Sequence, residues 1–577
     1  MKTLPVGTLL SFAVLVGGCR SPHVSCPPPT VDEAVVTLDQ GWDAEQQVCF
    51  YDTTQGSQLV PYSWAIALER PQDEALFLSD ENIDDLGFLS RGFDPAAENV
   101  EAHLPIGFVK DGDKDELGFT CAACHTSQLE YRGNKLRVDG AGTLGDMPRL
   151  LLELTKSVET TLDSNAKLNR FVDRVLGSNP PASESDKLVA ELTNYRTERR
   201  DYDRRNASDL VPGNGRLDAF GRIFNKALAL TEAGEDNFNP PDAPVSYPFL
   251  WGTHQSDFVQ WNGFASNANI GPIARNIGEV LGVFAEADIK SDPHRYASSA
   301  RAENLIQLEE WVRHLQAPIW REDILGPIDR AKAERGSVLY TEYCVKCHNR
   351  VDRTDIDREV IAWMENLESI GTDPKTATNI LSHRGKTGIL EGRKAEVIAG
   401  DKFLDVATAD NITGNVVLGL LLAKPVADIE TELAAIRQGR GGKGPTKQGN
   451  YHPDNPLNNE PKASFLAYKG RSLTGAWATA PFLHNGSIPN MWQLLTREDD
   501  RVKQFDLGSR EFDPVNLGFP INQVGAKFTF KVEDANGDLI AGNSNRGHSG
   551  KDFGTELSDA DKWALIEYMK TEMNALQ

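Results

Sequence analysis

Two copies of a Cys-x-x-Cys-His motif constrain this chain more than any other feature of its sequence. Residues 121–125 read CAACH and residues 344–348 read CVKCH. In each copy, two thiols one turn apart can add to the two vinyl groups of one haem, and the adjoining histidine then faces the iron. A zinc knuckle would need further Cys or His pairs, and a thioredoxin-like motif would not need the histidine. The motifs therefore predict two covalently attached haem c groups, with His125 and His348 as proximal ligands. The predicted attachment residues are Cys121, Cys124, Cys344 and Cys347.

The ligand on the far side of each iron decides what such a chain does. Two strong ligands make an electron carrier, whereas an open side admits peroxide or dioxygen. Histidines and methionines are the candidates, and their spacing does not choose among them. For the haem at CAACH the candidates are His254, His294, His314 and Met147. For the haem at CVKCH they are His383, His452, His484, His548, Met491 and Met569.

The net charge and the length of the chain limit the partners and the number of domains that can be expected. The 577 residues contain 60 Lys and Arg against 84 Asp and Glu, which gives a net charge of −24. This field repels phosphate backbones and excludes nucleic acid as the expected partner. With 40% hydrophobic and 25% charged residues, the chain is expected to fold in water, and its length suits about two to four domains.

The start of the sequence resembles an export signal. A basic residue, Lys2, precedes an apolar stretch, Leu9–Val16, that is far too short to span a membrane. Two glycines and Cys19 follow, and small residues before a cysteine resemble the lipobox of bacterial lipoproteins. We therefore expect residues 1–18 to be a lipoprotein signal peptide and Cys19 to carry lipid. The alternative is an ordinary cleavage site beside an incidental cysteine.

The expected location is the cell envelope. Because Arg20 follows Cys19, resemblance to Gram-negative lipoproteins implies an anchor in the outer membrane, with the protein facing the periplasm or the cell surface. Beyond Val16 the sequence has no run of about 18 apolar residues. Cys26 and Cys49 remain after the lipid and haem sites are assigned. In an oxidising compartment they form either a disulfide near the tether or two free buried thiols.

The predicted fold class is mainly α, with two cytochrome c-like haem domains, long loops and a few short strands. Apolar residues at helical spacing predict helices over 302–316, over a segment that runs into Cys344, and over the end of the chain after an N-cap at Ser558. The predicted units are a tether and N-terminal extension at 19–50, a first haem domain at 51–325 and a second haem domain at 326–577.

Several stretches resemble a known family, the dihaem c-type cytochromes of the cytochrome c peroxidase and MauG superfamily, within them the branch of bacterial rubber oxygenases. The most specific stretch is LTGAWATAPFLHNGS at 473–487, which is similar to the MauG-type motif. The others are Leu117–Thr120 leading into CAACH, Thr126–Gly140, Tyr247–Trp251, Gln260–Gly263, Ala274–Asn276 and Gly542–His548. Together they cover most of the chain from about Pro105 onward.

The resemblance implies roles for individual residues. His548 would be the distal ligand of the second haem and make it six-coordinate, which leaves the first haem open and reactive. His484 would be a catalytic residue of the MauG-type motif, next to the ligands. Trp251 or Trp261 would lie between the haems, and packing in the core is the alternative for either tryptophan.

The first functional expectation is a peroxidase-like haem oxidoreductase. A small oxidant, peroxide, would react at the open first haem, and a redox partner protein would supply electrons through the second. One alternative is a haem-dependent dioxygenase that cleaves an unsaturated hydrophobic substrate, as rubber oxygenases do. The other is an electron-transfer lipoprotein without catalysis.

Overall fold

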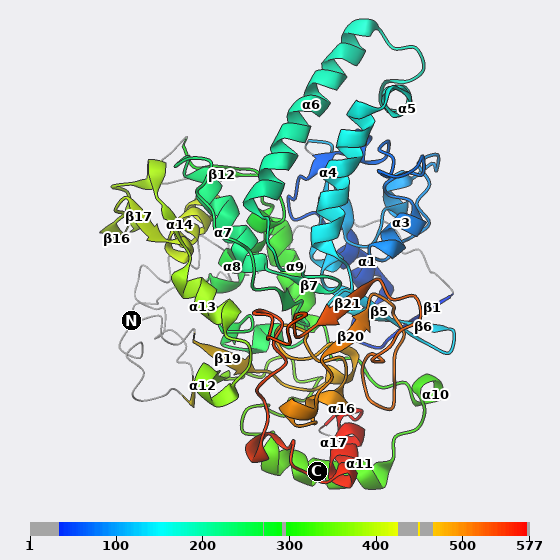
Figure 1. The fold of residues 1–577 in the computed structure, drawn as a ribbon, viewed down its shortest axis with the longest axis vertical. Helices are drawn as coiled ribbons and strands as arrows, with labels where there is room; N and C mark the ends of the chain where they lie inside the picture. The colour runs from blue at the N-terminus through cyan, green and yellow to red at the C-terminus, as the bar shows by residue number, and fades with distance from the viewer. Residues whose placement is uncertain are drawn as a thin grey trace, which may run out of the picture.

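The computed structural model describes residues 34–573 apart from 113, 269, 291–295, 398, 425–447 and 451–465, and for 448–450 it describes the backbone alone. Of the described residues, 39% are helical and 16% lie in strands. The expectation of a mainly α chain is therefore corrected to a mixed α and β fold (Figure 1).

Helices of very different length account for the α part. In the described part of the chain they are α1 (Ala44–Asp52), α2 (Tyr62–Ala65), α3 (Asp80–Asp85), α4 (Met147–Asp163), α5 (Asn165–Leu176), α6 (Ala182–Arg205), α7 (Ala219–Leu230), α8 (Gly271–Gly282), α9 (Ala302–His314), α10 (Glu322–Leu325), α11 (Arg330–Tyr343), α12 (Leu367–Ile370), α13 (Lys375–Ser382), α14 (Ala409–Leu422), α16 (Met491–Leu494) and α17 (Asp559–Met569).

The strands are short and form several small sheets rather than one large one. They are β1 (Val35–Thr37), β2 (Val60–Pro61), β3 (Phe108–Asp111), β4 (Glu116–Phe119), β5 (Thr126–Tyr131), β6 (Asn134–Asp139), β7 (Arg216–Leu217), β8 (Val245–Ser246), β9 (Phe258–Val259), β10 (Ala265–Ser266), β11 (Ala287–Asp288), β12 (Ala297–Ser298), β13 (Trp363–Asn366), β14 (Arg384–Lys386), β15 (Lys394–Glu396), β16 (Ala399–Lys402), β17 (Val406–Thr408), β18 (Gln448–Asn450), β19 (Ala467–Gly470), β20 (Gln504–Leu507) and β21 (Phe528–Lys531).

The hairpin of β5 and β6 shows why the mainly α expectation failed. It follows CAACH directly, and its turn residues Arg132 and Gly133 have φ of 51° and 82°. Two consecutive left-handed residues make the kind of tight turn whose twist matches that of the paired strands. Leu129 lies opposite Leu136 across the hairpin, and both side chains are buried. Apolar residues thus alternate with polar ones at strand spacing in a stretch that we had not assigned to strands.

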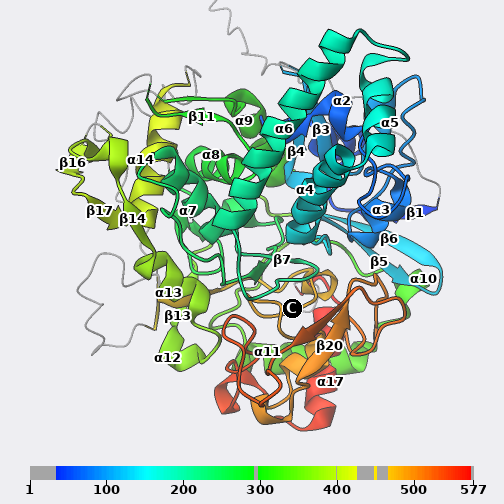
Figure 2. The same cartoon turned by 45° about the horizontal axis from the view of Figure 1, so that its top comes forward.

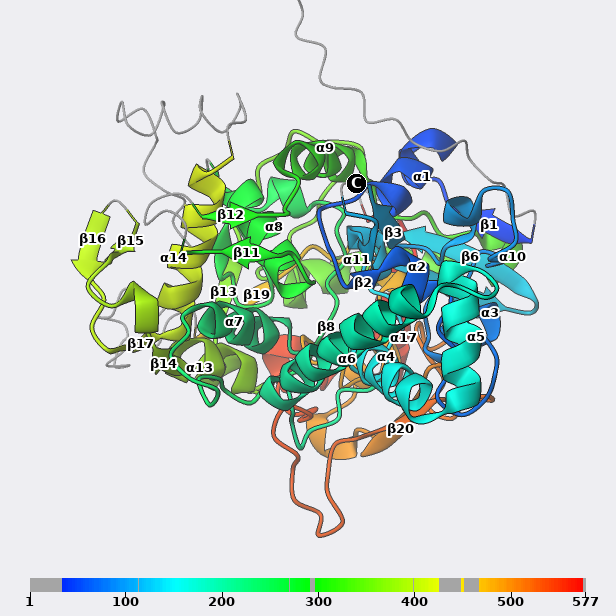
Figure 3. The ribbon, with the colours of Figure 1, turned by 90° about the horizontal axis from the view of Figure 1, so that it is seen from above.

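A helical cluster of α7, α8, α9 and α14 forms one side of the molecule, and α3, α5 and β6 lie on the opposite side (Figure 3). Its core contains Phe224, Ile277, Leu305 and Val416, one from each helix. Three of these helices belong to the predicted first haem domain, but α14 comes from the predicted second. The boundary between 325 and 326 stays a prediction, and the packing of α14 runs across it.

Helices α11 and α17 cross at the other end of the molecule from α5 and α6 (Figures 1 and 2). Gly336 makes the close crossing possible, because a Cβ at this position would lie 2.0 Å from the carbonyl oxygen of Ala564. The Ser558 side chain caps α17 by accepting a hydrogen bond from the Asp561 N–H at 3.2 Å. The helices predicted before Cys344 and at the end of the chain are therefore confirmed.

The structure describes the predicted tether only from residue 34 onward. Cys49 is disulfide-bonded, which excludes a free thiol there. The other four cysteines among the described residues are free, so the partner of Cys49 lies outside them, as do Cys19, Cys26 and the predicted signal peptide. None of the helices that the structure describes combines the length and the apolarity that a membrane span requires.

Candidate cofactor sites at the two CxxCH motifs

The first motif opens onto a large cavity. Residues Cys121–Ala123 form one turn of 3-10 helix, and the Thr120 hydroxyl accepts the Ala122 N–H at 3.2 Å to begin it. Gly107 brings the neighbouring chain close, since a Cβ there would lie 2.0 Å from the Ala123 nitrogen. The cavity beside this turn has a volume of about 220 Å³, and Cys121, Cys124 and His125 all line it.

His125 is held in the form that binds a metal. Its Nδ1 lies 2.9 Å from the Pro248 carbonyl oxygen, and because a carbonyl can only accept, Nδ1 is the protonated nitrogen. Burial lowers the pKa of His125 to about 4, so the ring is neutral near pH 7. Nε2 therefore keeps its lone pair for a metal. Two free thiols and a correctly oriented imidazole around one cavity fit haem c.

A group of charged side chains also reaches this cavity, from α8 and α9. Arg275 forms an ion pair with Glu309, and the Asn276 amide donates to the same carboxylate at 2.7 Å. Glu279 lies one turn beyond Arg275 and accepts a hydrogen bond from the Gln260 amide at 3.3 Å. Burial raises the pKa of Glu279, Arg275 lowers it and Glu309 raises it further. The resulting pKa lies above the ordinary value of a glutamate carboxyl. Glu279 is thus a carboxyl group that holds its proton at higher pH than usual.

The rest of the cavity wall is largely apolar and aromatic. Its apolar residues are Phe119, Met147, Leu151, Leu217, Phe220, Ile223, Phe249, Leu250, Val259, Phe284, Leu308 and Val312. Of the candidate distal ligands, Met147 is in this wall, His254 lines a neighbouring pocket and His314 ends α9. His294 lies outside the described residues.

The second motif starts where α11 ends, at Cys344. His348 Nδ1 donates to the Arg471 carbonyl oxygen at 2.6 Å, which again fixes the protonated nitrogen and leaves Nε2 available. Burial lowers the pKa of His348, so this ring is also neutral. Tyr340 of α11 donates its hydroxyl to the His348 carbonyl oxygen at 2.7 Å and holds the motif against the helix.

His548 faces His348, and their ring centroids are 6.3 Å apart. A metal ion bound between two opposed imidazoles would set the centroids at roughly 6 Å, from two bonds of about 2 Å and half a ring on each side. Burial is the largest cause that lowers the pKa of His548 to about 3, which keeps the ring neutral. The spacing and protonation of this pair fit a metal between them.

The chain around His548 is fixed by its neighbours. His548 has φ of 45°, and its N–H donates to the Ile370 carbonyl oxygen at 2.7 Å. The Arg501 guanidinium donates to the carbonyl oxygens of Asn545, Gly547 and His548. Among the other candidates for this iron, Met491 and Met569 are buried in an apolar cluster and His452 lies outside the described residues.

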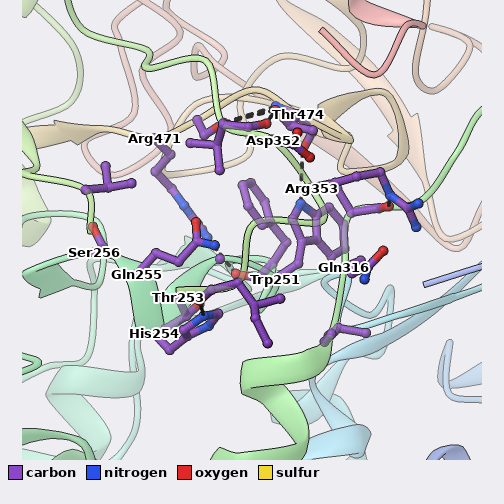
Figure 4. Close-up of a pocket in the computed structure, with 18 of the residues that line it drawn as sticks. Trp251, Thr253, His254, Gln255, Ser256, Gln316, Asp352, Arg353, Arg471 and Thr474 are labelled. Carbon is purple, nitrogen blue, oxygen red and sulfur yellow. Dashed lines mark hydrogen bonds between the residues drawn. The ribbon is translucent and has the colours of Figure 1, made fainter. Parts of the chain in front are cut away.

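The two tryptophans lie on different pockets. Trp251 stacks on Phe249 with ring centroids 4.5 Å apart, donates to the Thr474 carbonyl oxygen at 3.0 Å and lines a second pocket together with Arg471 (Figure 4). Trp261 lines the cavity of His125 and donates to the Ser246 carbonyl oxygen at 2.9 Å. Each indole N–H thus donates to a main-chain carbonyl oxygen, and each ring lines a pocket.

His484 lies apart from both of these pockets. Its ring stacks on Tyr468 with a centroid distance of 3.9 Å, and burial lowers its pKa to about 3. Its carbonyl oxygen accepts the Ser246 N–H at 2.9 Å. The Nε2 atom has no hydrogen-bond partner among the described residues. The catalytic role expected for His484 therefore stays a prediction. His484 does not line the cavity of His125 itself, but it is bonded to Ser246, which does.

Comparison with known proteins places the chain in a family. It is 30% identical to the uncharacterized protein y4iJ of Sinorhizobium fredii over an alignment of 635 positions, which covers 98% of both proteins. This chain belongs to the y4iJ family. It is also 24% identical over 384 positions to the uncharacterized protein y4iM of the same organism, with 63% of this chain and 73% of y4iM covered. Residues 467–506 match the family described as RoxA-like, cytochrome c-like.

The RoxA-like match supports the rubber-oxygenase branch of the resemblance. A cytochrome c-like segment implies covalently bound haem c and a haem-dependent oxidoreductase in this member of the y4iJ family. The matched segment contains Arg471, whose carbonyl oxygen holds His348, and also His484.

Sequence reasoning found some residues of the first cavity and missed others. The stretches around Tyr247, Gln260 and Arg275, which are far apart in the sequence, meet at the cavity of His125. Glu279 and Glu309 were not singled out. The spacing of Arg275 and Glu279 by one helical turn was a usable signal, since it puts opposite charges on one face of a helix with otherwise apolar neighbours.

Proposed function

We propose that this protein is a dihaem c oxidoreductase that reduces peroxide in the cavity of His125 and receives electrons through the centre of His348 and His548. The observation that carries this proposal is Glu279, a carboxyl group with a raised pKa in the same cavity as His125. Reduction of hydrogen peroxide consumes two electrons and two protons and yields two water molecules. A carboxyl group that keeps its proton to higher pH than usual suits the point where the oxygen–oxygen bond breaks.

The residues of the cavity have distinct tasks in this proposal. Haem c bound at His125 would supply an iron that exchanges electrons and binds a small oxidant. Glu279 gives its carboxyl proton to the departing oxygen of the peroxide, and Gln260 holds the carboxyl in place through its amide. Arg275 is fixed by Glu309 and stabilises negative charge as it develops on the oxidant. The apolar wall keeps bulk water away from these groups.

A dioxygenase that cleaves an unsaturated hydrophobic substrate is the second candidate. The observation that favours it is the aromatic and aliphatic wall of the cavity, together with the RoxA-like match at 467–506. An apolar chain would be bound there by burial of its surface, and dioxygen rather than peroxide would be the small oxidant. Oxygen uptake with an unsaturated hydrocarbon, without added peroxide, distinguishes this candidate from the first.

Binding of a small ligand tests the unequal roles of the two centres. We expect cyanide on the oxidised protein and carbon monoxide on the reduced protein to bind one equivalent per chain, because His548 fills the second iron. His548→Ala should raise this to two equivalents and convert a low-spin signal to a high-spin one in electron paramagnetic resonance. His383→Ala is the matched control and should leave one equivalent. Two low-spin irons that bind neither ligand, with Met147 as the further ligand, would support the electron-carrier alternative instead.

We also propose that Cys19 tethers the protein to the outer membrane and that a redox protein of the cell envelope is its electron donor. A fatty-acid analogue should label the wild-type protein in the membrane fraction, and Cys19→Ala should abolish the label. Cys49→Ala, which leaves the lipobox intact, should keep it. Equal labelling of wild type and Cys19→Ala would contradict the tether.

A further inference from the structure

The two proximal histidines are joined by a short series of contacts that uses three residues. His125 Nδ1 donates to the Pro248 carbonyl oxygen at 2.9 Å. The next residue, Phe249, accepts a hydrogen bond at its own carbonyl oxygen from Arg471 Nη2 at 2.6 Å. Arg471 then accepts the hydrogen bond of His348 Nδ1 at its carbonyl oxygen, also at 2.6 Å. The same arginine therefore touches the loop that orients one ligand and directly orients the other.

The Arg471 guanidinium also lies over the aromatic ring of Phe249. Its central carbon is 3.6 Å from the ring centroid of Phe249 and 5.6 Å from that of Trp261. A guanidinium held over an aromatic face and bonded to the same residue's carbonyl oxygen is restricted in two ways. Movement of the Phe249 loop must therefore move Arg471, and with it the acceptor of His348.

The charge of Arg471 is enclosed without a carboxylate. Removal from water lowers its pKa to about 9, so it stays protonated near neutral pH, and none of the described carboxylates forms an ion pair with it. Arg471 lines both the cavity of His125 and the pocket of Trp251, and Figure 4 shows it in the second of these. Enclosing a charge without an ionic partner destabilises the fold by itself. Such a charge is best explained by an effect on the two centres between which it lies.

We infer that Arg471 is a positioning residue that couples the two haem centres. It orients His348 directly, holds the Phe249 loop whose neighbour Pro248 orients His125, and places one positive charge beside both centres. The inference rests on the proposed function, because it requires two haems. A positive charge favours the reduced form of each centre, since reduction adds an electron. When an electron passes between the centres, one centre loses it and the other gains it, so no further reactant is needed. The contacts of Phe249 and Arg471 join the two ligand loops directly.

The test is a redox titration of the two haems in the full-length holoprotein, followed by visible spectroscopy. In Arg471→Met we expect both midpoint potentials to fall, because the shared positive charge is gone while the carbonyl oxygen that holds His348 remains. In Phe249→Leu we expect a shift at the haem of His348, although Phe249 belongs to the loop that orients His125. The second variant keeps the test informative if Arg471→Met folds poorly, and thermal unfolding reports on folding in each case.

Arg216→Met is the matched control. Arg216 is also buried, has a pKa lowered to about 9 and lies over the ring of Phe530 at 4.6 Å. It bonds Asn543, in the segment that leads to His548, but it has no hydrogen bond to Phe249 or Arg471 among the described residues. Its substitution should not reproduce the joint fall of both potentials. A shift in Arg471→Met confined to the haem of His348, or an equal shift of both potentials in Arg216→Met, would overturn the inference and leave the proposed function standing. Wild-type protein that carries fewer than two haems would overturn both.

Discussion

Glu279→Gln should lower the rate of peroxide reduction by about 10²–10⁴-fold while the haem content stays that of the wild type. Glutamine keeps the size of the side chain and its hydrogen bond to Gln260, but it has no proton to give to a departing oxygen. The measurement is steady-state turnover of peroxide with a reduced electron donor. Glu116→Gln is the matched control, because burial raises the pKa of Glu116 to about 7 at a position that does not line the cavity. Equal losses in both variants would point to a general effect on the fold.

The pH dependence of peroxide reduction by the wild-type protein should report the ionisation of Glu279. Burial raises the pKa of Glu279, with Glu309 adding to the shift and Arg275 opposing it, so the active protonated form persists above the ordinary range of a carboxyl. Activity should therefore fall as the pH rises through this raised pKa. In Glu279→Gln that decline should be missing from the residual activity. A decline that is unchanged in the variant would assign the proton to another group.

Replacing both cysteines of one motif should remove one haem completely. We expect the wild-type mass to show two haem additions that survive extraction with acidified acetone, and each double variant to show one. The variant without Cys121 and Cys124 should also lose turnover, because it lacks the reactive centre. The variant without Cys344 and Cys347 should lose turnover that depends on a protein donor. A wild-type mass with a single haem would reject the assignment of one of the two motifs.

Local sequence patterns predicted three of the helices, α9, α11 and α17. The helix expected at 302–316 is present as α9, and the last helix begins at the N-cap that Ser558 provides. In both helices, apolar residues recur at helical spacing, and residues that favour helix ends flank them. Neighbouring residues alone are therefore enough to predict these helices. The hairpin after CAACH was missed because its turn uses Arg132 rather than asparagine or aspartate beside Gly133.

Long-range contacts in the site were harder to foresee. The charge group of the first cavity combines Gln260, Glu279 and Glu309, which come from three separate segments, and a carboxyl pKa depends on what burial places around it. The role of Arg471 depends on a carbonyl oxygen and on a ring 222 residues away, Phe249. Neither a main-chain acceptor nor a distant stacking partner leaves a pattern in a single sequence.

The position of α14 has a consequence for how the protein is made. The Asn415 side chain of this helix accepts the Tyr296 hydroxyl at 2.9 Å, and the Gly419 backbone approaches the same ring so closely that a Cβ would lie 2.2 Å from it. A nascent chain that has emerged only as far as residue 325 therefore still lacks the helix against which α7 and α8 pack. CAACH becomes available for haem attachment while this core is incomplete, whereas CVKCH, at 344–348, follows shortly before α14 itself. The order of the chain therefore allows haem to reach CAACH before α14 completes the core beside this motif.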